Sequence, residues 1–123
     1  MVVDTGIFID HFRAKDKSTT DLFKLSKSHK LSISSVTLYE LYIGTQTKDK
    51  EIDIKFLIEG LSILPFTDKE AIKAAQIYEE LKRNNQLIEF RDIFIAATSI
   101  VNELPIATLN KKHFKRIEEL KIF

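Results

Sequence analysis

The chain has 123 residues, 44% hydrophobic and 30% charged. This balance excludes a disordered chain and predicts one globular domain spanning residues 1–123. A net charge of +1, from 19 basic and 18 acidic residues, argues against a protein whose whole surface binds nucleic acid, and a cysteine count of 0 excludes disulfide bonds and thiolate metal sites.

Short apolar strands alternate with helices along the chain. In chain order, the pattern predicts a strand at 1–3, helices at 5–13 and 18–28, a strand at 31–34, helices at 35–46 and 49–60, a strand at 62–66, helices at 67–83 and 91–103, a strand at 105–108, a helix at 111–119 and a last strand at 121–123. Strands separated by helices pair in parallel. The predicted fold class is therefore α/β, a three-layer α/β/α fold with a central parallel sheet of four or five short strands.

Two helix starts carry capping-box patterns. Ser18 is followed three residues later by Asp21, and Thr67 is followed by Glu70. These pairs predict the first turns of the helices at 18–28 and 67–83.

No stretch of the sequence is apolar for long enough to span a membrane. The longest, "IFIAATSIV", is far shorter than the roughly 20 residues that a spanning helix needs. The opening "MVVDTGIFID" lacks the basic leader of a secretory signal. We expect a cytoplasmic protein that does not engage a membrane.

Three acidic residues have no basic neighbour that could neutralise them. Glu51 can pair with Lys55 one helical turn away, whereas Asp4, Glu40 and Asp92 have no basic residue at such positions. Asp4 could cap the helix that follows it, and Asp92 could complement the dipole of its helix. Glu40 lies in the middle of "SSVTLYELYIG", a helix predicted to be buried, where neither explanation applies. Since a buried unpaired carboxylate is costly, the three together favour one shared site.

Ligands of parallel α/β sheets bind beyond the carboxyl ends of the strands. Asp4 and Asp92 belong to that edge, and Thr5, Ser34 and Thr108 supply hydroxyl groups there, as neighbours of the ligands or as helix caps. Oxygen ligands without cysteine suit a hard cation, Mg²⁺ or Mn²⁺. Such a site indicates hydrolysis of phosphodiester bonds.

Four segments together resemble the PIN-domain ribonucleases, and specifically the VapC-type toxins of prokaryotic toxin–antitoxin pairs. In family order and spacing, they are "VVDTGIFID" at 2–10, "ISSVTLYELYIG" at 33–44, "RDIFIAATS" at 91–99 and "IATLNKKHF" at 106–114. The resemblance covers essentially the whole chain. It implies a Mg²⁺- or Mn²⁺-dependent endoribonuclease that leaves a 5′-phosphate and a 3′-hydroxyl.

The resemblance also implies roles for individual residues. Asp4, Glu40 and Asp92 match the acidic metal ligands, and a fourth catalytic position falls on Asn110, where many members carry aspartate. The family strand order places the first strand beside the fourth, which would bring Asp4 next to Thr108 and Asn110. One formal charge fewer than usual argues against a tightly held second metal ion.

Partners follow from the same resemblance. RNA is the expected substrate, with its phosphates contacted by basic residues of "NKKHFKR", namely Lys111, Lys112, Lys115 and Arg116. The other expected partners are a cognate VapB-type antitoxin, whose extended tail would occupy the cleft, and a second copy of the chain in a homodimer.

Three other functions are compatible with parts of the pattern. A phosphorelay receiver domain has this length, but it needs an acidic pair after the first strand, where only Asp4 stands. A metal-free ribonuclease would need two cooperating histidines from His11, His29 and His113. A non-catalytic PIN-like module that binds RNA or protein is the main alternative, since Asn110 replaces a charged ligand.

Overall fold

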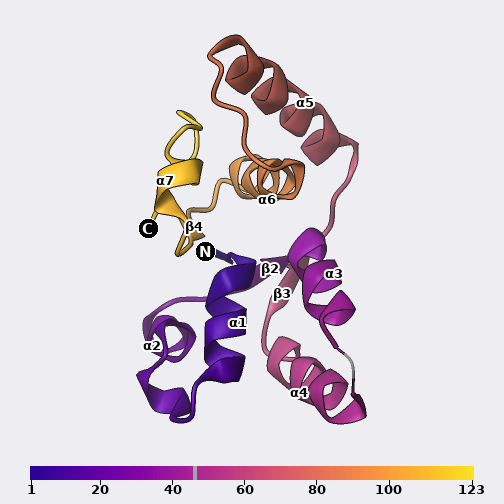
Figure 1. Ribbon diagram of the computed structural model, residues 1–123, viewed down its shortest axis with the longest axis vertical. Coiled ribbons are helices and arrows are strands. Elements are labelled where there is room, and N and C mark those ends of the chain that lie inside the picture. Colours follow the sequence, from indigo (N-terminus) through magenta and orange to yellow (C-terminus); the bar gives the residue numbers. More distant parts are fainter. Residues whose placement is uncertain (46) are drawn as a thin grey trace.

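A computed structural model describes residues 1–45 and 47–123 of the chain (Figure 1). In these residues the order of elements is β1 (Val2–Val3), α1 (Thr5–Arg13), a 3₁₀ turn (Lys17–Thr19), α2 (Asp21–Ser28), β2 (Ser32–Ser34), α3 (Ser35–Ile43), α4 (Lys48–Ile58), β3 (Ser62–Leu64), α5 (Asp68–Arg83), α6 (Phe90–Val101), β4 (Ile106–Ala107) and α7 (Lys111–Phe114). The alternation of short strands and helices predicted from the sequence is confirmed.

The strands form one parallel sheet in the order β3-β2-β1-β4. Val2 lies in register with Ser32 on one side and with Ile106 on the other. The first strand is therefore central and adjacent to the fourth, as the family resemblance implied. This order brings the residues that follow β1 and β4 together at the carboxyl edge of the sheet.

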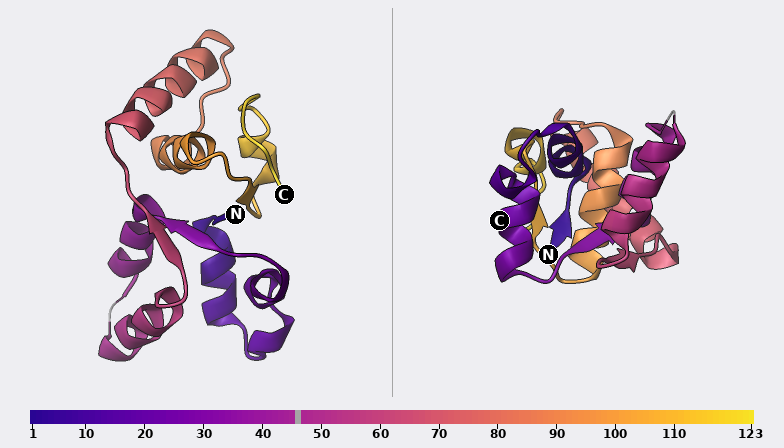
Figure 2. Two further views of the ribbon diagram at one scale, coloured as in Figure 1. Left: turned by 180° about the vertical axis from the view of Figure 1, so that it is seen from behind. Right: turned by 90° about the horizontal axis from the view of Figure 1, so that it is seen from below.

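Alternate side chains of the strands enter two separate cores, one on each face of the sheet. Val2 and Ile106 pack with α5, α6 and the segment after α7, whereas Val3, Ile33 and Ala107 pack with α1 to α4. Figure 1 shows the two groups of helices above and below the sheet, and Figure 2 shows the same division from behind. The three-layer α/β/α fold is confirmed, because a strand buried on both faces needs helices on both sides.

Several predicted bounds differ from the structure. The last helix, predicted at 111–119, ends at Phe114, and the predicted strand at 121–123 is reduced to a single bridge between Ile122 and Ile106. The strand predicted at 62–66 ends at Leu64, before a proline that lacks the N–H needed to extend it. The helix predicted at 35–46 ends at Ile43, and position 46 lies outside the described residues.

The prediction that the helix carrying Glu40 is buried was wrong. In α3 only Thr37 and Leu41 are buried, and Tyr39 and Ile43 are exposed. The helix is apolar all round in sequence, yet it packs through one face and leaves the other open to solvent. Apolar composition was therefore not a sign of burial in α3, and the exposure of Tyr39 requires another explanation.

The start of α2 is capped by a different residue from the one predicted. Ser18 lies in the preceding 3₁₀ turn, where its hydroxyl donates to Asp16, while Thr20 accepts the backbone N–H of Phe23 at 3.2 Å. At α5, Thr67 is the cap as predicted, but its hydroxyl bonds to the Glu70 carboxylate, in place of the expected bond from Glu70 to the backbone.

Replacing Thr20 by alanine is expected to lower the free energy of unfolding by about 1 kcal/mol, the usual cost of losing an N-cap. Ser18→Ala serves as the matched control and is expected to change it by less than about 0.5 kcal/mol, because Ser18 is exposed and does not cap the helix. Urea unfolding of both variants measures the difference. Equal losses would contradict the observed cap.

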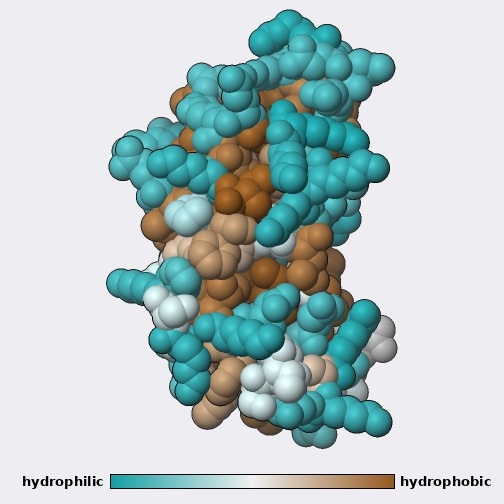
Figure 3. Space-filling model, turned by 90° about the vertical axis from the view of Figure 1, so that its left-hand side faces the viewer, coloured by the Kyte–Doolittle hydropathy of each residue, from teal (hydrophilic) through white to brown (hydrophobic). Residues whose placement is uncertain are grey.

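Apolar side chains gather on one part of the surface. On the face shown in Figure 3, hydrophilic side chains cover the upper and lower parts, and an apolar band crosses between them. Among the described residues, no helix has both the length and the apolar composition to cross a membrane.

Candidate active site

Asp4 directly follows β1 and is buried, with 7% of its surface exposed. One carboxylate oxygen accepts the backbone N–H of Thr5 at 2.8 Å, and the other accepts the hydroxyl of Thr108 at 2.7 Å. Burial raises the pKa of Asp4, and these two hydrogen bonds act against the increase. Asp4 therefore does cap α1, but it also brings a carboxylate to the sheet edge next to the end of β4.

Glu40 reaches the same edge from α3. Its Oε1 accepts the hydroxyl of Thr5 at 2.8 Å, and the Thr5 hydroxyl also lies 3.2 Å from that of Thr37. The Ser34 hydroxyl bonds to the Thr37 hydroxyl at 3.1 Å and accepts the Thr37 N–H. Because each hydroxyl has one proton and Thr5 gives its proton to the carboxylate, the chain of donors runs from Ser34 through Thr37 and Thr5 to Glu40.

Glu40 also has a partner that helical spacing could not reveal. Nη1 of Arg91 lies 3.8 Å from Oε2 of Glu40, across the gap between α6 and α3. Arg91 is held more closely by Glu89, through Nε at 2.9 Å and through Nη2. Glu40 therefore has a distant basic neighbour, although the long distance and the exposure of the pair make the contact weak.

Asp92 lies in the first turn of α6 and is half-buried. Burial, followed by the negative charges of Asp4, Glu89 and Glu40, raises the pKa of Asp92 to about 6, and Arg91 opposes the change. The structure therefore brings the three acids identified from the sequence within electrostatic reach of one another. Their negative charge is not fully compensated by the protein itself.

The raised pKa of Asp92 predicts how stability depends on pH. The folded protein holds the proton of Asp92 more tightly than the unfolded chain does, so protonation of Asp92 stabilises the folded protein. This contribution is complete below the unfolded pKa of 3.8 and is lost as the pH rises through about 6. After discounting for solvent exposure, the loss is about 1 kcal/mol. In EDTA, Asp92→Asn should therefore be more stable than the wild type at neutral pH, with a smaller difference near pH 4. Urea unfolding at both pH values tests this, and a variant less stable at neutral pH would contradict it.

Asn110 is joined to Asp4 through Thr108. The Thr108 hydroxyl donates to Asp4 and accepts the backbone N–H of Asn110 at 2.9 Å. The side-chain amide nitrogen of Asn110 donates to Nδ1 of His113 at 2.9 Å. The predicted fourth position is thus linked to Asp4 through Thr108, and its amide nitrogen is engaged by His113 of α7.

The four basic residues predicted to contact RNA divide into two groups. Lys111, Lys112 and Lys115 are exposed, whereas Arg116 is half-buried and donates to the backbone carbonyls of Gln86 and Leu87 in the loop before α6. The guanidinium of Arg116 therefore supports the loop that leads to Asp92.

The histidines do not form the pair that metal-free cleavage of RNA requires. His11 bonds to Thr20, His29 packs edge-on against Phe123, and His113 bonds to Asn110. The three rings thus have separate local partners in separate parts of the fold, which argues against that alternative.

The oxygen donors of the acids fit Mg²⁺ or Mn²⁺ only as an open site with few protein ligands. Among residues 1–45 and 47–123, no three His, Cys, Asp or Glu side chains are grouped closely enough to enclose a metal ion. Mg²⁺, however, is usually held by one or two carboxylates and keeps several water molecules. The oxygen-only donors and the raised pKa of Asp92 match such an open site, while a closed cage of protein ligands is not present in these residues.

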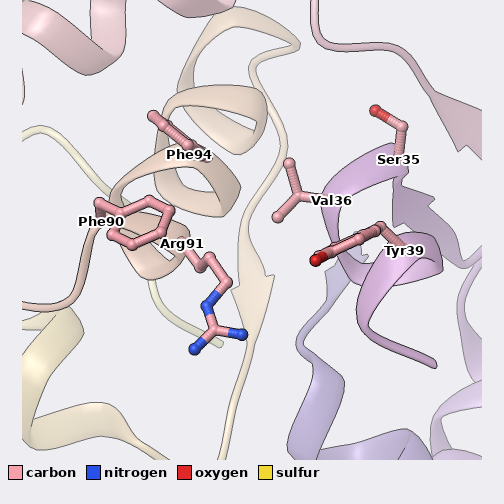
Figure 4. A pocket seen from close by; sticks show the side chains of 6 residues that line it. All are labelled: Ser35, Val36, Tyr39, Phe90, Arg91 and Phe94. Carbon is pink, nitrogen blue, oxygen red and sulfur yellow. The ribbon is translucent and has the colours of Figure 1, made fainter. Parts of the chain in front are cut away.

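A groove of about 330 Å³ lies between α3 and α6. Its lining is mostly apolar and includes Arg91, the residue that contacts Glu40 (Figure 4). This groove was not predicted from the sequence. An aromatic residue one or two positions before a candidate ligand, as in "YE" and "FRD", was the available signal.

A parallel sheet with acids gathered beyond its carboxyl edge agrees with the PIN-domain class that the sequence resembles. The family model described as "PIN domain" matches residues 1–120, and the chain belongs to this family.

Within that family the chain groups with the VapC ribonucleases. It is 34% identical to Ribonuclease VapC of Rickettsia bellii, over 99% of this chain and 93% of the relative. It is 31% identical to Ribonuclease VapC1 of Methanocaldococcus jannaschii, over 100% of this chain and 86% of the relative. Among solved structures, it superimposes with a TM-score of 0.86 and 28% identity on a chain of DNA-bound VapBC from Salmonella typhimurium, covering 99% of this chain and 95% of that chain.

Proposed function

We propose that the protein is a Mg²⁺- or Mn²⁺-dependent endoribonuclease and the toxin of a type II toxin–antitoxin pair. The observation that carries the proposal is the acidic cluster, in which the charges of Asp4, Glu89 and Glu40 act on a half-buried Asp92. A protein that only bound RNA would gain nothing from a concentrated negative charge, since RNA is itself an anion. A divalent cation relieves this repulsion, and the relatives are named as ribonucleases.

Asp4 and Asp92 would hold the metal ion, with Glu40 contributing directly or through water. Bound there, the ion would supply an activated water and stabilise the charge of the phosphodiester. The chain's own residues provide the positioning. Thr5 orients Glu40, and Thr108 orients Asp4.

RNA would approach across the same edge of the sheet. The exposed Lys111, Lys112 and Lys115 lie on and just after α7, which begins one residue beyond Asn110. They are suited to contact phosphates near the site without reading sequence.

The proposed protein partner is a VapB-type antitoxin. The support is the likeness to a chain of the Salmonella VapBC complex at 28% identity. A homodimer is proposed on the family resemblance alone. Cytoplasmic action is part of the proposal, because the proposed substrate is cellular RNA.

The direct test is to incubate the purified protein, free of antitoxin, with total RNA in Mn²⁺. We expect endonucleolytic products with 5′-phosphate ends, found by sequencing those ends, and none in EDTA. Cleavage in EDTA that leaves a cyclic phosphate would replace the proposal with a metal-free mechanism. Binding of RNA without cleavage in Mn²⁺ would support the non-catalytic module.

A further inference from the structure

The groove between α3 and α6 presents two aromatic rings to solvent. Tyr39 of α3 is 58% exposed and Phe90 of α6 is 59% exposed. Figure 4 shows the Tyr39 side chain directed toward the α6 wall, where Phe90, Phe94 and Arg91 lie. A protein forgoes free energy of folding when it leaves large apolar side chains of this kind exposed. Their placement at a hollow therefore indicates a binding role.

The chemistry and size of the groove suit a single base. Every nucleobase has a flat apolar face that stacks on aromatic rings and on guanidinium groups, and Arg91 lies 5.9 Å from the centre of the Phe90 ring. The volume of about 330 Å³ is at the lower end for small-ligand sites and leaves room for one base.

The position of the groove links it to the acids. Arg91 lines the groove, contacts Glu40, and directly precedes Asp92. An RNA chain whose phosphate reaches the acids must place a neighbouring nucleotide beside them. Arg91 has five N–H donors, more than its contacts with Glu89 and Glu40 use, so it can also meet an RNA phosphate.

We propose that Tyr39 and Phe90 form a subsite that stacks one unpaired base of the RNA next to the cleaved bond. The inference rests on the proposed nuclease function and adds to it a preference for single-stranded RNA at the cleavage point. It makes Tyr39 and Phe90 substrate-binding residues that contact a base adjacent to the reacting phosphate.

The test measures binding without cleavage, in an Asp92→Asn background. Fluorescence anisotropy compares a short, labelled single-stranded RNA of mixed sequence with an abasic ribose-phosphate oligomer of the same length. Tyr39→Ala and Phe90→Ala should each weaken RNA binding about tenfold and leave binding of the abasic oligomer within about twofold, because stacking on one aromatic residue contributes about this much.

Two further variants control for the aromatic ring and for the surface. Tyr39→Phe keeps the ring and should bind RNA within about twofold of the background protein. Phe56→Ala removes an aromatic side chain that is 77% exposed on α4 and does not line the groove, and it should have no effect. Circular dichroism verifies that all variants are folded.

Two results would overturn the subsite. Unchanged RNA affinity in Tyr39→Ala and Phe90→Ala would remove it, and equal losses for RNA and the abasic oligomer would show that base stacking is not involved. Cleavage by the wild type in Mn²⁺, measured alongside, separates these results from failure of the nuclease function itself.

Discussion

Asp92→Asn is expected to lower the rate of RNA cleavage in Mn²⁺ by more than about 100-fold, because even the neighbours of metal ligands cost about 10- to 100-fold when they are replaced. The protein should remain folded. Asparagine has the shape of aspartate, and its neutral amide removes the buried charge and the repulsion that together raise the pKa of Asp92 to about 6. Initial rates at saturating Mn²⁺, with unfolding curves of the same samples, measure both effects.

The matched control for this change is Asp53→Asn. Asp53 is an exposed acid on α4. This helix packs on the face of the sheet opposite to α6. Asp53→Asn changes the net charge of the protein by the same amount and should leave cleavage within about twofold. A fully active Asp92→Asn variant would remove Asp92 from the proposed site.

Thr108→Val should damage both stability and cleavage. Thr108 is buried, and its hydroxyl bonds to the Asp4 carboxylate and to the backbone N–H of Asn110. Valine has nearly the same shape but leaves both of these groups without that partner. Each unsatisfied buried group costs about 1–3 kcal/mol, so we expect the free energy of unfolding to fall by about 2–4 kcal/mol.

The same change should lower cleavage about 10- to 100-fold, because Thr108 orients a proposed metal ligand. Loss of this hydrogen bond also raises the pKa of Asp4 further and so favours its protonated form. Thr108→Ser retains the hydroxyl and should keep cleavage within about fivefold of the wild type. A Thr108→Val protein with wild-type stability and rate would show that the observed bond has no role.

The layered fold could be predicted because its signals are local. Short apolar strands followed by amphipathic segments imply a parallel sheet. Val2 and Val3 are adjacent and both apolar, which indicates that both faces of the central strand are buried. Helix ends were predicted less well. The cap of α2 is Thr20 and not the predicted Ser18, because the intervening 3₁₀ turn has no distinct sequence signal.

The composition of the acidic cluster was also predictable, whereas its partners were not. Asp4, Glu40 and Asp92 were found because each lacks a basic residue one helical turn away. The contacts of Glu40 with Thr5 and Arg91 span 35 and 51 residues of sequence, and only the tertiary fold brings them together. Arg116, predicted to contact RNA, also bonds through one guanidinium nitrogen to a loop 29 residues away, a contact that charge patterning could not indicate.

The burial of α3 was misjudged for a physical reason. An apolar sequence was taken to mean a buried helix, but the exposed ring of Tyr39 lines a groove that also contains Arg91, a neighbour of Glu40. A binding surface and a core can have the same composition, since both remove apolar area from water, one on binding and the other on folding.

The central claim is that Asp4 and Asp92 hold a divalent metal ion, with Glu40 contributing directly or through water, and calorimetric titration with Mn²⁺ at neutral pH tests it most directly. We predict saturable binding to the wild type, an affinity at least tenfold lower for Asp92→Asn, and an unchanged affinity for Asp53→Asn. Absence of Mn²⁺ binding by the folded wild-type protein, or equal affinity for wild type and Asp92→Asn, would contradict the account.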